Sequence, residues 1–166
     1  RMLDQCVPLV RDGERVLDLA CGTGYITRKL LATETDFSLV GVDVSAGMLA
    51  VCGKRNRDAR AEFIHAEGAA FLRENTEPFD RVYFGWALPY FKRTKLLPLL
   101  RRNLKPGGTV TLISNSKGTL SKVDRVFYHV LKDHLGQCRK YLDIQNNLPR
   151  DQDGLRRWFA QYGFQS

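Results

Sequence analysis

The chain has 166 residues, 43% of them hydrophobic and 27% charged, a composition that suits a single folded domain with one core. Its formal net charge of +8 is uneven: residues 1–83 carry 11 Lys and Arg against 13 Asp and Glu, whereas residues 84–166 carry 15 against 5. No apolar run approaches the ~20 residues of a membrane-spanning helix, and no cationic-then-apolar leader opens the chain, so neither a membrane span nor a signal peptide is expected. The basic half fits an anionic substrate, a nucleic acid, a lipid surface or a merely solvated face.

In the first half of the chain, short apolar segments alternate with helical ones. Residues 3–10 are expected to form a short helix or arm. Strands are expected at 15–19, 38–42, 61–65 and 80–84, separated by helices at 25–32, 46–55 and 68–74. The segment 38–42 is apolar without alternation, which is typical of a parallel strand covered on both faces, and Ser45 is the expected N-cap of the helix that follows it. This spacing predicts a doubly wound parallel sheet.

The second half completes that alternation and then departs from it. A helix is expected at 92–104, a Pro-Gly-Gly turn at 106–108 and a fifth strand, rich in β-branched residues, at 109–114. Beyond that strand, apolar residues recur at helical spacing over 119–135, and 153–162 is expected to form a last helix.

The four cysteines show no C-x-x-C pairing; they are Cys6, Cys21, Cys52 and Cys138. This pattern predicts reduced thiols in a cytoplasmic protein and no metal site. Cys21 lies in a glycine-rich turn that needs a small side chain, so we expect it to be a packing residue rather than a nucleophile.

The most informative segment is Val-Leu-Asp-Leu-Ala-Cys-Gly-Thr-Gly over residues 16–24, a buried strand that enters a glycine turn before a helix. Such a turn directs backbone N–H groups into one crevice. Asp18 ends the strand, and its carboxylate would repel a pyrophosphate but favour an ammonium or sulfonium group. A dinucleotide-binding fold is the alternative, but Thr27 stands where the G-x-G-x-x-G fingerprint requires its third glycine.

This segment resembles the first motif of the class I S-adenosylmethionine-dependent methyltransferases, in which an acid, a small residue and Gly-x-Gly follow a strand. Asp18, Ala20, Gly22 and Gly24 match that motif. The resemblance covers most of the chain and implies a three-layer, Rossmann-like α/β fold, a doubly wound sheet of five parallel strands in the order 3-2-1-4-5. It also implies S-adenosylmethionine as the cofactor and S-adenosylhomocysteine as its product.

The end of the chain departs from the family pattern. Family members continue past a Gly-Phe pair, here Gly163-Phe164, into a hairpin of two further strands, whereas this sequence ends at Ser166. We therefore expect either a truncated C-terminus without the hairpin of strands 6 and 7, or a fifth strand covered by something outside the family pattern. In the first case, the open edge of the fifth strand would invite self-association.

Two further segments match motifs that bind the nucleoside in this family. Asp43 and Val44 stand in the second motif, where the acid would accept hydrogen bonds from the ribose hydroxyls, and Met48 would lie against the adenine. Glu67 and Gly68 follow the third strand, where an acid and a backbone N–H would meet the adenine edge. A helix-capping role for Asp43 and a solvent-exposed role for Glu67 are the alternatives.

The segment after the fourth strand resembles the motif that borders the transferable methyl group. Gly85 would offer a backbone carbonyl, and Trp86 would offer an aromatic face to the sulfonium, although Trp86 could also be a plain core residue. Pro89 and Tyr90 match part of the adenine-N6 methyltransferase motif, but Ala87 replaces its amide or acid and cannot accept a hydrogen bond. Methylation of a nucleic-acid base at N6 is therefore not favoured.

No catalytic base is evident, and the weak candidates are His129 and Tyr90. The resemblance predicts a single methyltransferase domain over residues 1–166, in which residues 117–150 form a basic, helical cap beside the acceptor. We expect methyl transfer to an O, N or C nucleophile of a small molecule, with an acidic acceptor compatible with the charge. An RNA methyltransferase and a non-catalytic binding domain of the same fold are the alternatives.

Overall fold

A computed structural model describes residues 10–119, 125–126, 129 and 147–165. The predicted arm at 3–10 and the helix at 119–135 fall almost wholly outside the described residues, as do Cys6 and Cys138. The chain divides into two compact units, one of residues 1–85 and 102–113 and the other of residues 86–101 and 114–166.

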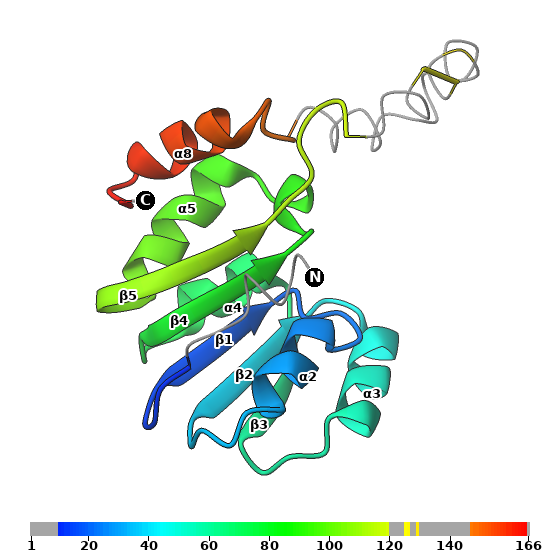
Figure 1. Cartoon of the computed structure of the whole chain (residues 1–166), viewed down its shortest axis with the longest axis vertical. Helices are drawn as coiled ribbons and strands as arrows, with labels where there is room; N and C mark the ends of the chain where they lie inside the picture. Colours follow the sequence, from blue (N-terminus) through cyan, green and yellow to red (C-terminus); the bar gives the residue numbers. More distant parts are fainter. Residues whose placement is uncertain (1–9, 120–124, 127–128, 130–146, 166) are drawn as a thin grey trace. The chain divides into compact units, whose positions relative to one another are not determined.

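The first unit contains a five-stranded sheet in which all neighbouring strands are parallel (Figure 1). The strands are β1 (Arg15–Leu19), β2 (Ser38–Asp43), β3 (Ala61–His65), β4 (Phe79–Gly85) and β5 (Leu104–Ile113). Their order, β3-β2-β1-β4-β5, confirms the predicted fold class. The order reverses between β1 and β4, and the carboxyl ends of strands at such a point form the usual ligand crevice of an open α/β sheet.

Three helices connect the strands of the first unit, at the positions predicted. They are α2 (Tyr25–Leu31), α3 (Ala46–Arg55) and α4 (Gly68–Glu74), and Figure 1 shows α2 in front of the sheet and α4 behind it. Ser45 caps α3 as expected, since its hydroxyl accepts a hydrogen bond from the Met48 N–H at 3.3 Å. Right-handed crossovers place connecting helices on both faces of a sheet with this strand order.

The middle of this sheet is the core of the first unit. Val16, Leu17 and Leu19 of β1 are completely buried, as are Val82 and Phe84 of β4. Strands covered on both faces need apolar side chains in both directions, which explains why β1 and β4 lack a polar alternation. A buried pair of strands therefore supports the residues that follow their carboxyl ends.

The fifth strand differs from the prediction. It begins at Leu104, not at residue 109, and includes the Pro-Gly-Gly segment. Phe79 of β4 lies opposite Leu104 but Arg81 lies opposite Thr109, so five positions pass along β5 while two pass along β4. Gly107 has a φ of +78°, and a Cβ at Gly108 would lie 3.0–3.1 Å from three carbonyl oxygens. The segment is thus a bulge inside the strand, because these glycines allow the close approach.

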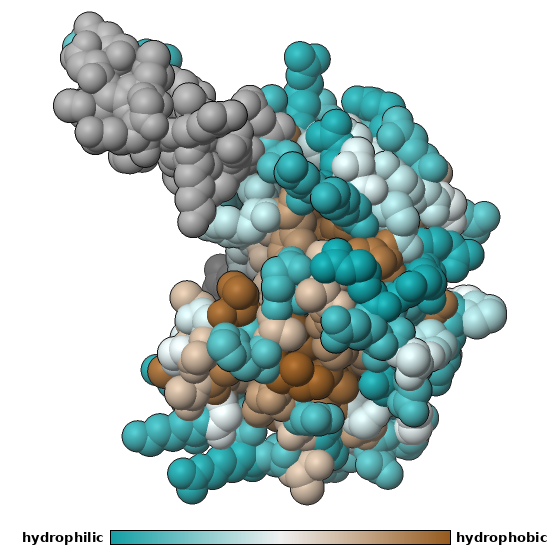
Figure 2. Space-filling model, turned by 180° about the vertical axis from the view of Figure 1, so that it is seen from behind, coloured by the Kyte–Doolittle hydropathy of each residue, from teal (hydrophilic) through white to brown (hydrophobic). Residues whose placement is uncertain are grey.

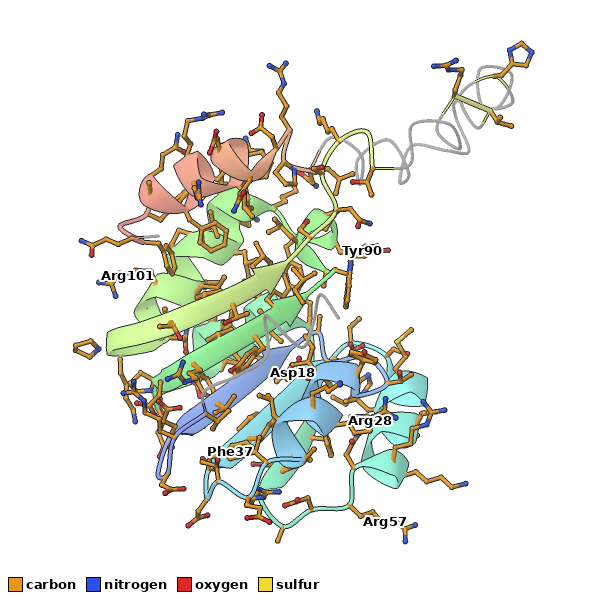
Figure 3. All side chains as sticks on the ribbon, viewed as in Figure 1. Asp18, Arg28, Phe37, Arg57, Tyr90 and Arg101 are labelled. Carbon is orange, nitrogen blue, oxygen red and sulfur yellow. The ribbon has the colours of Figure 1, made fainter. Side chains whose placement is uncertain are left out.

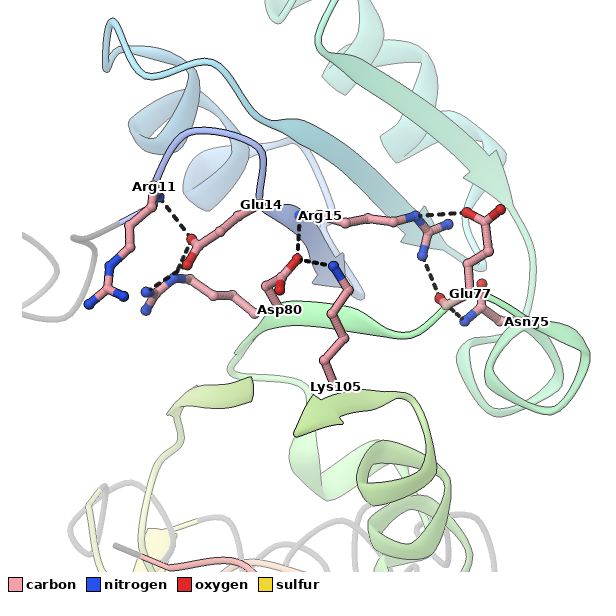
Figure 4. Close-up of polar contacts among 8 residues, drawn as sticks. Arg11, Glu14, Arg15, Asn75, Glu77, Asp80 and Lys105 are labelled. Carbon is pink, nitrogen blue, oxygen red and sulfur yellow. Dashed lines mark hydrogen bonds and ion pairs between the residues drawn. The ribbon is translucent and has the colours of Figure 1, made fainter. Parts of the chain in front are cut away.

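The strands' amino ends are joined by ion pairs (Figure 4). Arg81 donates to both carboxylate oxygens of Glu14, at 2.6 and 3.0 Å. Asp80 accepts from the Arg15 N–H at 2.8 Å and from Lys105 Nζ at 2.7 Å. The hydrogen bonds from Arg81 lower the pKa of Glu14, and burial, which would raise the pKa of Asp80, is outweighed by its hydrogen bonds. These contacts join β1, β4 and β5 at one end.

The second unit contains the short 3₁₀ helix η1 (Leu88–Tyr90), α5 (Arg93–Arg102) up to residue 101, and α8 (Gln152–Ala160). The Arg93 guanidinium lies 4.3 Å from the ring centroid of Trp158, a cation–π contact between α5 and α8. Asn147 donates from Nδ2 to the Pro89 carbonyl at 3.2 Å. Residues 147–165 are therefore anchored to the segment that follows β4.

The visible surface in Figure 2 is mostly hydrophilic, with apolar side chains in small groups. Among the described residues, no helix combines the length and the apolar character needed to cross a bilayer. Within the same residues, β3 and β5 are the edge strands, and no further strand lies beside β5. Self-association through the open edge of β5 stays a prediction.

Candidate functional site

The glycine turn after β1 adopts an unusual backbone conformation. Ala20, Gly22 and Gly24 all have positive φ, at +57°, +56° and +80°. Ala20 is not a glycine, and such a conformation costs an L-residue roughly 1–2 kcal/mol. A Cβ on Gly24 would overlap the side chains of Cys52 and Asn56, so α3 packs directly against this turn. A strained alanine, Ala20, and two glycines with positive φ therefore form a tight turn at the carboxyl end of β1.

Asp18 lies at the end of β1, beside α2 (Figure 3). Its side chain is 1% exposed, and its Oδ2 accepts hydrogen bonds from the Thr27 hydroxyl at 2.6 Å and the Thr27 N–H at 3.0 Å. Burial raises the pKa of Asp18 to about 6, against the effect of the Thr27 donors. A buried carboxylate of this kind favours a cationic partner.

Asp43 ends β2 and connects two turns. Its Oδ2 accepts a hydrogen bond from the Gly22 N–H at 2.8 Å, and its Oδ1 accepts one from the Ser45 N–H at 2.9 Å. The residue is 8% exposed. Because each carboxylate oxygen can accept more than one hydrogen bond, both remain able to bind a pair of ligand hydroxyls.

Apolar side chains stay exposed next to these acids. Val44 is 67% exposed and Met48 is 48% exposed. Met48 Sδ lies 3.7 Å from the position of a Cβ on Gly22, so this side chain covers the glycine turn. Two buried acids and two exposed apolar side chains therefore lie at the same edge of the first unit, as a ligand with a planar apolar group and hydroxyls requires.

The end of β3 completes the described site. Glu67 is exposed, and its carboxylate accepts hydrogen bonds from the N–H groups of Ala69 and Ala70 at 3.0 and 2.7 Å. It is therefore the N-cap of α4, and adenine contact by Glu67 and by the buried Gly68 stays a prediction. His65 Nε2 lies 2.9 Å from the Val44 carbonyl oxygen, which joins the end of β3 to the corner after β2.

The structure adds two residues that sequence reasoning does not assign to the site. The sequence pattern marks Thr27 only as a missing glycine, although it bonds to Asp18 twice. His65 ends the predicted strand at 61–65, a position that predicts only a packing role for it. A hydroxyl residue three positions after Gly-x-Gly, with an acid before the turn, is the signal that could have indicated Thr27.

Gly85 ends β4, and the next residue, Trp86, has a strained backbone conformation. A Cβ on Gly85 would lie 2.8 Å from Ile26 Cδ1, so Ile26 of α2 packs closely against the end of β4. Trp86 has a φ of +54° and is 42% exposed, so it is not a plain core residue. Tyr90 is 68% exposed and projects from η1 (Figure 3). Trp86, Tyr90 and the exposed His129 belong to the second unit.

The two described cysteines are buried free thiols in contact with the turn. A hydrogen bond with Cys52, together with burial, raises the pKa of Cys21, which fits its predicted packing role. The described residues contain no group of three or more His, Cys, Asp or Glu side chains able to hold a metal ion.

Sequence comparisons place this arrangement in a family. Residues 16–108 match a family model described as a methyltransferase domain. The chain is 32% identical over 93% of its length to a demethylmenaquinone methyltransferase of Clavibacter sepedonicus, of which it covers 66%. It is also 32% identical over 71% of its length to a ubiquinone/menaquinone biosynthesis C-methyltransferase of Coxiella burnetii, of which it covers 49%. The chain thus spans less than two thirds of the length of these relatives.

A structural comparison agrees with these relatives. Phosphoethanolamine N-methyltransferase 2 of Haemonchus contortus, solved with phosphomonomethylethanolamine and S-adenosylhomocysteine, superimposes with a TM-score of 0.69 at 28% identity. The match covers 98% of this chain and 35% of that protein. The family model alone spans more than half of the sequence, and the fold and the motif after β1 agree with it. The chain therefore belongs to the class I S-adenosylmethionine-dependent methyltransferases.

Proposed function

We propose that this chain transfers the methyl group of S-adenosylmethionine to a ring carbon of a quinone-type small molecule. The observation that carries the proposal is the pair of buried acids at the carboxyl ends of β1 and β2, in a chain 32% identical to quinone-pathway methyltransferases. A cationic amino acid joined to a nucleoside suits that pair, whereas a pyrophosphate would meet two carboxylates and no basic side chain bonded to either among the described residues.

Each part of the cofactor has a candidate partner in the first unit. Asp18 would receive the ammonium group, and Asp43 would receive the ribose hydroxyls while it keeps its bonds to Gly22 and Ser45. Val44 and Met48 would pack against the adenine. The remaining cofactor-binding candidates in this unit are Ala20, Gly24, Glu67, Gly68 and Gly85, and Trp86, which belongs to the second unit, is a candidate from its sequence motif alone.

The methyl donor is a sulfonium, which is already activated, so positioning and removal of water can supply most of the acceleration. A new carbon–carbon bond forms as the sulfur–methyl bond breaks, and the ring carbon then loses its proton to a base or to water. Tyr90 and His129, both exposed, are the candidates for that base. The exposed aromatic rings of Trp86 and Tyr90 suit a flat aromatic acceptor.

N-methylation of a phosphorylated amine is the second candidate. It is supported by the likeness to phosphoethanolamine N-methyltransferase 2 and by the charge of the second half, where 15 Lys and Arg stand against 5 Asp and Glu. A phosphate group would be attracted to that charge.

The test is methyl transfer by the purified chain from labelled S-adenosylmethionine. Reduced demethylmenaquinone, phosphoethanolamine and a structured RNA are offered separately, and S-adenosylhomocysteine binding is measured by calorimetry in parallel. We expect label on the quinol carbon. Transfer to phosphoethanolamine alone would establish the second candidate, and saturable, salt-sensitive transfer to RNA would establish the nucleic-acid alternative.

A matched pair of variants sharpens the test. Tyr90→Phe removes the candidate base while it keeps the exposed ring, and Tyr162→Phe removes a hydroxyl near the end of the second unit. If Tyr90 accepts the proton, only the first variant lowers the rate of transfer, with cofactor affinity unchanged. Cofactor binding without transfer to any acceptor would instead identify a non-catalytic binding domain.

A further inference from the structure

Thr27 makes two hydrogen bonds to one oxygen of the buried acid. It is completely buried in the first turn of α2, and both its hydroxyl and its N–H donate to Oδ2 of Asp18, at 2.6 and 3.0 Å. Oδ1 of the same carboxylate accepts no hydrogen bond from the described residues. The two oxygens of Asp18 therefore have different surroundings: one is held by α2 and one is left for a ligand.

We propose that Thr27 is a positioning residue, which fixes Oδ2 of Asp18 so that Oδ1 is presented, ionised, to the ammonium group of S-adenosylmethionine. The inference rests on the proposed role of Asp18 as the partner of that group. It assigns a polar task to a position at which a dinucleotide-binding fold carries a glycine for helix packing.

The groups around Asp18 show why Thr27 is needed. Asp43 on β2 is negatively charged, and its charge, like burial, favours the protonated form of Asp18. Cys21 in the turn and Cys52 on α3 are neighbouring thiols, and Tyr83, opposite Asp18 on β4, has a pKa raised by burial. The described groups that favour the ionised carboxylate are the two donors of Thr27.

Two substitutions distinguish the contribution of the Thr27 hydroxyl from that of its methyl group. Thr27→Val keeps the shape and the β-branch but removes the O–H, whereas Thr27→Ser keeps the O–H. Thr33→Val is the matched control, because the Thr33 hydroxyl donates to the neutral Leu30 carbonyl at 2.8 Å, at the other end of the same helix. All four proteins are titrated with S-adenosylhomocysteine by calorimetry between pH 5 and pH 7, and thermal melting verifies that each is folded.

We expect the wild-type affinity to fall with decreasing pH around a midpoint near the pKa of Asp18, about 6. A midpoint about one pH unit higher in Thr27→Val would weaken binding about fivefold at pH 6 and about twofold at pH 7. Thr27→Ser and Thr33→Val should retain the wild-type midpoint. A shift of the midpoint that is rescued by serine cannot arise from packing alone.

Three results would overturn the inference. An unchanged midpoint in Thr27→Val would show that the hydroxyl does not favour ionisation. Equal weakening in Thr27→Ser and Thr27→Val would assign the effect to the lost methyl or shape. Wild-type binding that does not vary with pH, and that survives Asp18→Asn, would show that Asp18 is not the ammonium partner; this outcome removes the proposed role of Asp18 itself. If Thr27→Val does not fold, Thr27→Ala is compared with Thr27→Ser for the same rescue.

Discussion

The acidic side chains at the two ends of the sheet in the first unit have pKa values shifted in opposite directions. At the amino ends, Glu14 and Asp80 are bonded to cationic side chains, and the pKa of each is lowered (Figure 4). At the carboxyl ends, Asp18 is buried beside a threonine and a second acid, and its pKa is raised to about 6. The first arrangement stabilises the fold, whereas ionisation of the buried Asp18 lowers its stability. This difference supports our proposal that the cofactor binds at the carboxyl ends of the strands.

Replacing Asp18 should have the largest effect, and in two directions. The pKa of Asp18 is raised from 3.8 to about 6 in the folded protein. The free energy of unfolding therefore falls as the pH rises through that window, by about 3 kcal/mol in the limit. Asp18→Asn removes this cost and can still accept from Thr27, so we expect a higher melting temperature at pH 7.5 together with weaker S-adenosylhomocysteine binding. Melting curves and calorimetry measure the two effects. A variant that is both less stable and equally able to bind would break the comparison.

Asp43→Ala should lower cofactor affinity next most. The substitution removes the acceptor for the N–H groups of Gly22 and Ser45 and the proposed acceptor for the ribose. Hydrogen bonds to charged groups contribute about 1.5–3 kcal/mol each, so we expect at least a tenfold loss of S-adenosylhomocysteine affinity. Glu62→Ala, an exposed acid on β3, is the control and should bind normally. Normal binding by Asp43→Ala would contradict the assigned site.

At the amino ends, the effect should appear in stability alone. Glu14→Gln removes the charge that pairs with Arg81 and one of its two acceptor oxygens, so the free energy of unfolding should fall by about 1–3 kcal/mol at pH 7, with cofactor affinity unchanged. Because the pKa of Glu14 is lowered in the folded protein, the wild type loses this contribution as the pH falls below about 4.5. Urea unfolding should therefore show a smaller difference between the two proteins at pH 3 than at pH 7.

Glu77→Gln is the matched control for that variant. Glu77 pairs with Arg15 at 3.4 Å, but its side chain is 76% exposed, so its removal should leave the urea midpoint unchanged. A loss of stability equal to that of Glu14→Gln would show that overall charge, not the partly buried Glu14–Arg81 pair, holds the amino ends together.

Most of this sheet can be predicted from sequence, because apolar segments and caps act locally. The strand at 61–65 and the helices at 46–55 and 68–74 agree with the structure to the residue. The start of β5 escapes prediction because Pro-Gly-Gly is equally typical of a turn and of a bulge, and only pairing with β4 distinguishes them. The role of Thr27 escapes it for a similar reason, since its partner Asp18 is nine residues away and is brought near by the turn.

The smallest effect, and the finest test of the carboxyl end, concerns His65. Its bond from Nε2 to the Val44 carbonyl fixes the corner that follows Asp43. His65→Leu should weaken S-adenosylhomocysteine binding about three- to fivefold, close to the ~1 kcal/mol of one hydrogen bond, with little change in melting temperature because His65 is exposed. His65→Gln places an N–H donor at a similar reach and should restore most of the affinity. Equal loss in both variants would mean that the imidazole ring, and not its donor, matters at this corner.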